Sequence, residues 1–145
     1  MRLRLLGLLL LAVAVVPALA VAGRTSSGKL EAYLSGKSEA PAKGAPAGKG
    51  NAAITITGTR VCWKISVTGI GTPLAAHIHK GKAGVAGGVV VPLGAKYKAK
   101  GCIATTPAFA KGIATHPGNY YVNVHTAKYP NGAVRGQLKA GDEDY

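Results

Sequence analysis

Apolar and polar residues alternate along seven short segments of this chain, and residues typical of turns separate the segments. The clearest segment places Val61, Trp63, Ile65 and Val67 on one face of an extended strand, because successive side chains of a strand point to opposite sides. The segments that we predict to be strands are 30–34, 52–57, 61–67, 74–79, 89–93, 120–126 and 133–138. Many short strands with turn residues between them predict an all-β sandwich.

Three connections have features of their own. Residues 106–115 predict one short helix, with Pro107 in its first turn and with Phe109 and Ile113 facing the sheets. The pair Asn131-Gly132 predicts a tight hairpin between the last two strands. The glycine-rich stretch 81–88 lacks the spacing of a phosphate-binding loop and has no helix after it, so we do not expect nucleotide binding.

Residues 1–22 have the layout of a secretory signal peptide. Arg2 and Arg4 give a positive start, an apolar stretch follows from 5 to 16, and small residues at Ala20 and Ala22 predict two alternative cleavage sites. The apolar stretch is shorter than the roughly 20 residues of a spanning helix, and an uncleaved anchor is the alternative. We expect a mature chain without a transmembrane span, secreted or held in the periplasm or cell envelope. It would comprise one domain, 23–139, and an acidic C-terminal tail, 140–145.

The chain is strongly basic, with 18 Lys and Arg against five Asp and Glu. Because Arg2 and Arg4 leave with the signal peptide, the mature chain keeps 16 basic residues and a net charge of +11. Such a charge favours anionic neighbours, for example an anionic envelope polymer. The lysines are scattered, however, which is also typical of a solvated surface. No nucleic-acid-binding motif or aromatic stacking platform occurs, so we expect no specific nucleic-acid partner.

Cys62 and Cys102 are the only two cysteines. Export to an oxidising compartment predicts a disulfide bond between them, with a metal-bound thiolate as the alternative. The bond would close a loop that contains His77 and His79. It would therefore help to hold the strand on which these two histidines lie.

Three histidines fall in two predicted strands at spacings that place them on one face. His77 and His79 are two residues apart, as are Asn123 and His125. Because imidazole is the commonest metal ligand, His77, His79 and His125 predict a mononuclear copper or zinc site. We expect Asn123 to orient a histidine or a bound water, and Arg135 to attract an anion. The alternative is a structural hydrogen-bond network that fixes the register of the strands.

These histidines lie inside two longer motifs that resemble the signatures of the chordin-type (CHRD) domain. The first is AHIHKGKAG at 76–84 with VVVPL at 89–93, and the second is YYVNVHT at 120–126 with YPNGAVRGQL at 129–138. The segment 34–41 is similar to the family's opening, so the resemblance covers about residues 28–139. It implies a secreted β-sandwich module without a settled activity. The family's acidic opening loop is Ala-Pro-Ala-Gly at 45–48 here, which argues against a cation site built on those acids.

The pattern is also similar to copper/zinc superoxide dismutases, which combine His-x-His, a later His and a late Arg. These resemblances imply a Greek-key antiparallel β-sandwich, immunoglobulin-like or dismutase-like, of about seven to eight strands with one short helix. The dismutase site also needs a bridging histidine and an aspartate. Between His79 and His125 this chain has no acidic residue, and its one histidine there, His116, is expected in an exposed loop. This argues against a binuclear dismutase.

We therefore expect a non-enzymatic extracellular or envelope module that binds an extracellular protein or an anionic envelope polymer and carries a candidate histidine metal site. The alternative is a mononuclear copper redox protein acting on superoxide or a related oxidant. The serines lack a nucleophile-elbow context, and the carboxylates outside the tail are Glu31 and Glu39. This argues against a hydrolase built on a serine triad or on paired carboxylates.

Overall fold

The computed structural model describes residues 27–141. The expected signal peptide and the acidic residues 142–144 of the expected tail lie outside the described residues. The elements in chain order are β1 (Ser27–Ser35), η1 (Gly36–Ser38), β2 (Lys49–Thr57), β3 (Arg60–Thr68), β4 (Pro73–Lys80), β5 (Val89–Pro92), β6 (Lys100–Ala104), α1 (Pro107–Thr115), η2 (Pro117–Asn119), β7 (Tyr120–Thr126), β8 (Val134–Gln137) and β9 (Lys139–Ala140). Within this part of the chain, no helix has the length and apolar character needed to cross a membrane.

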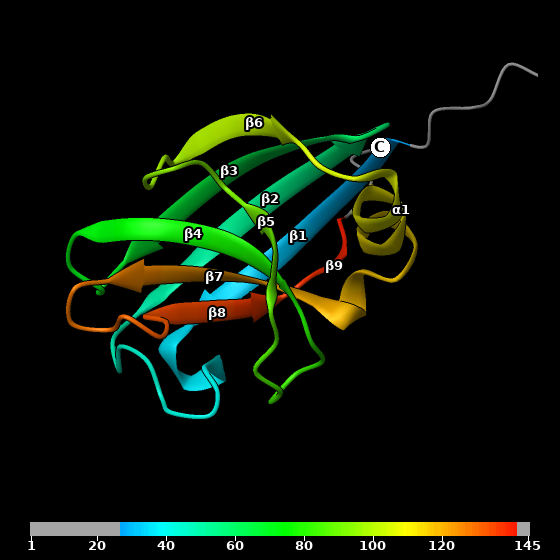
Figure 1. The fold of residues 1–145 in the computed structure, drawn as a ribbon. Helices are drawn as coiled ribbons and strands as arrows, with labels where there is room; N and C mark the ends of the chain where they lie inside the picture. Colours follow the sequence, from blue (N-terminus) through cyan, green and yellow to red (C-terminus); the bar gives the residue numbers. More distant parts are fainter. Residues whose placement is uncertain (1–26, 142–145) are drawn as a thin grey trace, which may run out of the picture.

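The strands form one antiparallel sheet in the order β5-β4-β7-β8-β1-β2-β3-β6, and β9 pairs with β1. The sheet curls so that β4, β7 and β8 lie in front of β1, β2 and β3, and side chains from both halves form one core (Figure 1). The sequence predicts an all-β antiparallel fold with one short helix, and this is confirmed. The expected pair of separate sheets is not found, because Ser35 of β1 pairs with Arg135 of β8 and joins the two halves into a half-barrel.

The segment between β5 and β6 runs along the open side of this half-barrel. The backbone N–H of Tyr97 donates to the carbonyl oxygen of Leu74 in β4 at 2.9 Å, and the N–H of Ile65 in β3 donates to Ala99 at 2.7 Å. The indole N–H of Trp63 donates to the carbonyl of Lys98 at 2.8 Å. These bonds tie the segment to both halves of the sheet.

Strand β6 follows this segment, and the sequence pattern does not predict it. It pairs with β3 in a register that places Cys102 directly opposite Cys62, and the two form the expected disulfide bond. A disulfide indicates an oxidising compartment. Strand β9, which is two residues long, is also missed by the pattern, whereas the seven predicted strands all occur within a few residues of their expected ends.

The helix α1 packs against the core with the face that the sequence predicts. Its N-cap is Thr106, whose hydroxyl accepts a hydrogen bond from the backbone N–H of Phe109 at 3.3 Å, and Pro107 occupies the first turn. Ile113 is fully buried, and Phe109 is half-buried against the core. The helix thus covers an end of the core and leaves the outer faces of the sheet to other residues.

Candidate functional site

The three predicted histidines lie together on the outer face of the β4–β7 pair. In the register of these two strands, His77 lies opposite Asn123, and His125 lies opposite Ala75, two residues before His77. The residues that alternate with the histidines along each strand are buried in the core. They are Ala76 and Ile78 in β4, and Val122 and Val124 in β7. The period-two spacing therefore builds the core and the group of histidines at once.

The nitrogens of these histidines are close enough to share one ion. One ring nitrogen from each of His77, His79 and His125 lies within 4.8 Å of the others, and all three side chains are half-buried. The closest pair is His77 Nδ1 and His125 Nε2, which are 3.1 Å apart. Two ligands of one tetrahedral zinc ion, with bonds of 2.0–2.1 Å, lie about 3.3 Å apart. The prediction that these side chains share a face is confirmed, and their role as ligands remains a prediction.

Backbone carbonyls fix the ring orientation of two of the histidines. The Nδ1–H of His79 donates to the carbonyl oxygen of Gly87, and the Nδ1–H of His125 donates to that of Pro130, both at 2.9 Å. A carbonyl oxygen only accepts, so these bonds hold the proton on Nδ1 and leave the lone pair on Nε2. The Nε2 atom of His79 is buried and has no hydrogen-bond partner. Buried polar atoms are rarely left in this way, and an unpaired imidazole lone pair is what a metal ligand requires.

The same surroundings favour neutral rings. The pKa of His77 is lowered from 6.5 to about 4, mainly by burial and also by the neighbouring His125 and His79. Burial also lowers the pKa of His79, against a weaker opposite effect of its bond to Gly87. Because only the neutral imidazole binds a metal, the lowered pKa of each of these two rings favours the form that can act as a ligand.

An aromatic and a cationic side chain support the histidine group from the neighbouring strands. The ring of Tyr121 on β7 is stacked on that of His79, with centroids 4.8 Å apart and planes within 6°. The guanidinium carbon of Arg135 on β8 lies 3.4 Å from the centroid of the Tyr121 ring. Arg135 is 1% exposed, and it donates to the carbonyls of Val85 and Lys82 at 2.9 and 2.7 Å. The predicted anion-attracting group is thus held by the 81–88 loop.

Glu39 is a member of this polar cluster that sequence reasoning missed. The amide of Asn123 donates to its Oε1 at 2.6 Å, and the two side chains are 3% and 2% exposed. Burial raises the pKa of Glu39 from 4.5 to about 7, and the charge of Arg135 opposes this rise. At Gly132, whose φ is +139°, a Cβ atom would lie 2.5 Å from that carboxyl oxygen, so glycine admits the acid. The sequence offered one signal for the importance of Glu39, which is that acidic residues are rare in this basic chain.

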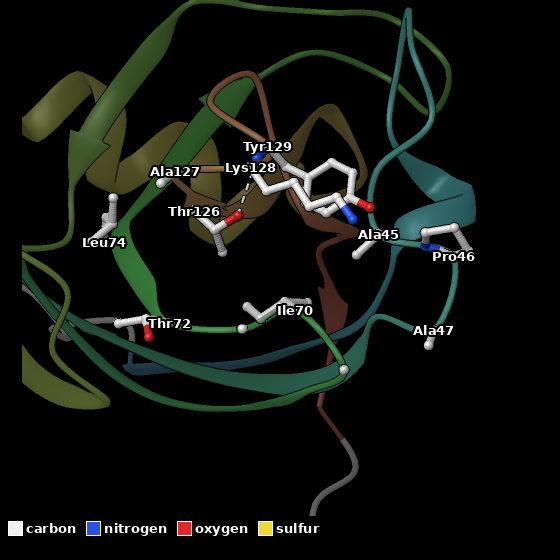
Figure 2. Close-up of a pocket in the computed structure, with 12 residues that line it drawn as sticks. Ala45, Pro46, Ala47, Ile70, Thr72, Leu74, Thr126, Ala127, Lys128 and Tyr129 are labelled. Carbon is white, nitrogen blue, oxygen red and sulfur yellow. Dashed lines mark hydrogen bonds between the residues drawn. The ribbon is translucent and has the colours of Figure 1, made fainter.

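His116 and a pocket at one end of the sheet both lie away from the histidine group. His116 is exposed, as expected, and its Nδ1 lies 2.8 Å from the hydroxyl of Thr115. A pocket of about 680 Å³ lies between the β1–β2 loop, the β3–β4 turn and the β7–β8 loop, and Lys128 and Tyr129 are the ionisable residues of its lining (Figure 2). No histidine lines it. This pocket therefore has no part in the candidate metal site.

The donor set indicates which ions the group suits. Three imidazole nitrogens suit copper or zinc, whereas calcium and magnesium require several oxygen ligands. In the described residues, no carboxylate belongs to the group. The residues present therefore fit a first-row transition metal with a position left open for water or another ligand.

Comparison with known proteins identifies the family. No curated protein and no solved structure matches this chain. The family model described as the CHRD domain matches residues 30–138, which include every strand from β2 to β8, all three clustered histidines and both cysteines. This span covers most of the chain and nearly all of the described fold, so the chain belongs to the CHRD domain family.

Proposed function

We propose that this protein is an exported, non-enzymatic binding module that holds one copper or zinc ion between His77, His79 and His125. The buried, unpartnered Nε2 of His79 carries the proposal, since its other nitrogen is already bonded to Gly87. His125 presents Nε2 in the same way. His77 would contribute Nδ1, which faces His125 Nε2, after its proton moves to its other ring nitrogen.

The surroundings of the group support binding more than catalysis. A copper redox protein acting on superoxide is the alternative, and it would use a cationic side chain to draw in the anion. Arg135 is buried and donates to two loop carbonyls, so its charge is directed into the protein. A bound copper would supply one-electron chemistry, and a bound zinc would supply none. The role that we propose for the surrounding residues is to hold the histidine rings in place, and it includes no catalytic step.

The proposed location is outside the cytoplasm, after removal of residues 1–22. The Cys62–Cys102 disulfide supports this location, as does the resemblance of the N-terminal segment to a signal peptide. The partner would be an extracellular protein or an anionic polymer of the envelope, because the chain carries 18 basic residues against five acidic ones.

Metal titration of the purified chain tests the proposal. We expect calorimetry with Cu²⁺ or Zn²⁺ to give one site per chain, and His125→Ala to weaken it by at least about 100-fold, since loss of a mere outer-shell partner costs 10–100-fold. His116→Ala is the matched control, because His116 is an exposed histidine outside the group, and it should bind like the wild type. A second readout is unfolding: metal at about 100 times Kd should stabilise the wild type by about 2.7 kcal/mol.

Two results would contradict the proposal in different ways. If the wild type binds no stoichiometric metal, or if both histidine variants lose it equally, the metal site is refuted. If the copper-loaded wild type speeds the decay of superoxide and loaded His116→Ala does so equally, while His125→Ala does not, the redox alternative replaces the non-enzymatic one.

A further inference from the structure

The outer face of the half-sheet formed by β1, β2, β3 and β6 is open and carries short side chains around one exposed aromatic ring. Tyr33 of β1, Asn51 of β2 and Ser66 of β3 form a row across three strands, and all three are exposed. Tyr33 is 64% exposed, more than any other large apolar or aromatic side chain of the described residues. The Nζ atom of Lys139 lies 4.8 Å from the centroid of the Tyr33 ring, so a ligand would stack on the side of the ring away from this ammonium group, beside the amide and the hydroxyl group.

Two shallow hollows flank this ring. One of about 400 Å³ is lined by Tyr33, Asn51, Ser66 and the basic Lys49, and the other, of about 320 Å³, is lined by Tyr33, Asn51, Ala53 and the acidic Glu31. The first hollow is therefore the one that suits an anionic ligand. Both share Tyr33 and Asn51, so the ring and the amide stand between them. A flat ring-shaped ligand could lie in either hollow with an edge against Asn51.

The next row across the same face begins with Glu31 on β1, which pairs with Ala53, and ends in two lysines. Ala53 pairs with Lys64, and Lys64 pairs with Lys100, so two exposed lysines lie directly opposite each other on β3 and β6. Like charges in such a pair repel, which lowers the stability of the free protein. Glu31 is the only acid on this face among residues 27–141, and it is 2.8 Å from Lys139. The face thus leaves room for an external anion beside Lys64 and Lys100.

We propose that this face, which we call the lysine–tyrosine face (Tyr33, Asn51, Ala53, Lys64, Ser66 and Lys100), binds an acidic polysaccharide. A sugar ring would stack on Tyr33, its hydroxyls would bond to Asn51 and Ser66, and uronate carboxylates would pair with Lys64 and Lys100. The row from β1 to β6 spans about 14 Å at the usual strand spacing, so it suits a polymer segment better than a single sugar. The inference rests on the exported location proposed above and specifies its anionic envelope partner.

Other occupants fit the face less well. A lipid surface would call for several apolar side chains that insert, and the other exposed large apolar residues, Leu74, Val85 and Val89, lie in or next to β4 and β5. A nucleic acid would call for several stacking rings, and the face has one. Lys100 of the edge strand β6 could instead only protect the sheet edge from pairing with another chain. These three alternatives predict different binding results from an acidic polysaccharide.

The test measures binding of polygalacturonate oligosaccharides to the purified full chain by calorimetry. We expect Lys64→Ala/Lys100→Ala to weaken binding roughly tenfold, as expected for the loss of two solvent-exposed ion pairs, and Tyr33→Ala to weaken it about fivefold while leaving the charge unchanged. Lys37→Ala/Lys111→Ala is the control, because it removes the same charge from exposed lysines outside the face, and it should bind like the wild type. Far-UV circular dichroism and thermal unfolding check that every variant is folded.

Each of four results would overturn the inference. The proposal fails if the polyuronate does not bind, or if the control pair weakens binding as much as the Lys64 and Lys100 pair, since the effect is then general charge attraction. It also fails if neutral dextran binds equally well. Finally, it fails if vesicles of phosphatidylcholine and phosphatidylglycerol, or single-stranded DNA, bind more tightly than the polyuronate and depend on Tyr33. The metal titration of the histidine group has separate variants, so either proposal can fail alone.

Discussion

Replacing Glu39 by glutamine tests whether one buried carboxyl group shapes the pH dependence of stability. Glu39 is 3% exposed, and burial raises its pKa from 4.5 to about 7, despite the opposing effects of Arg135, the Ala40 N–H and the Asn123 amide. At about 1.4 kcal/mol per pH unit, a pKa difference of this size corresponds to about 3 kcal/mol. Glutamine keeps the shape and the carbonyl that accepts from Asn123, but it does not titrate.

The sign of the effect follows from where the proton binds more tightly. Because the pKa of Glu39 is higher in the folded chain, its stabilising contribution is fully present below pH 4.5 and is lost as the pH rises through about 7. His77 acts in the opposite direction: burial lowers its pKa from 6.5 to about 4, so its contribution is lost as the pH falls from 6.5 to about 4. The two effects partly cancel in the wild type, and the variant removes only the first.

Urea unfolding at a series of pH values, with the disulfide intact, measures the effect directly. We expect the free energy of unfolding of Glu39→Gln, minus that of the wild type, to increase by about 3 kcal/mol between about pH 4 and about pH 8. Glu31→Gln is the matched control, since it removes one carboxyl from a surface ion pair, and its difference should change by less than about 1 kcal/mol. A flat difference curve for Glu39→Gln, or one equal to the control's, would refute the reasoning.

Three further predictions concern the stability of the fold. Changing both Cys62 and Cys102 to serine should lower the free energy of unfolding by about 4 kcal/mol in urea, because their bond closes a loop with a sequence separation of 40; an unchanged urea midpoint would contradict this. Lys64→Ala should raise it by about 0.2–1 kcal/mol by relieving repulsion from Lys100, and the gain should vanish at high salt; a salt-independent gain would point to another cause. Ile113→Ala, at a fully buried helix position, should cost about 2–5 kcal/mol in thermal or urea unfolding; a loss below about 1 kcal/mol would mean that α1 does not cover the core.

The strands could be predicted where alternation is strong and not where it is weak. Val61, Trp63 and Ile65 alternate with polar residues, and β3 runs through them as expected. In β6 the residues are Lys-Gly-Cys-Ile-Ala, which show no clear alternation, and the strand is held by its pairing with β3 and by the disulfide. A strand stabilised by a partner far away in the sequence leaves little local signal.

The curl of the sheet had no local signal either. Alternation assigns each residue to a face, but it does not say whether two groups of strands form separate sheets or one. The answer depends on one pairing between Ser35 and Arg135, which are a hundred positions apart in the chain. The face assignments hold in either arrangement, which is why the histidine group could be predicted although the two-sheet architecture was not found.

The histidine group shows the same division between strands and loops. Strand periodicity places His77, His79 and His125 on one face, and that much follows from spacing alone. Their proton positions come from the carbonyls of Gly87 and Pro130, which belong to loops that no periodicity orders. Glu39 likewise reaches Asn123 from a loop, 84 positions away in the sequence.

The alternation of apolar and polar residues along the strands therefore places polar side chains on two outer faces of the sheet. These two faces differ in how far loops cover them. On the β4–β7–β8 half, loops close over the polar side chains, and Arg135 and Glu39 are almost fully buried. On the β1–β2–β3–β6 half, within residues 27–141, no loop buries Tyr33 or the two paired lysines, which are exposed. Burial shields the first face from bulk ions, whereas exposed charges on the second are screened by salt. Metal binding at the histidines should thus vary little with ionic strength, and polymer binding on the lysine–tyrosine face should fall steeply, so a salt titration of both separates the two sites.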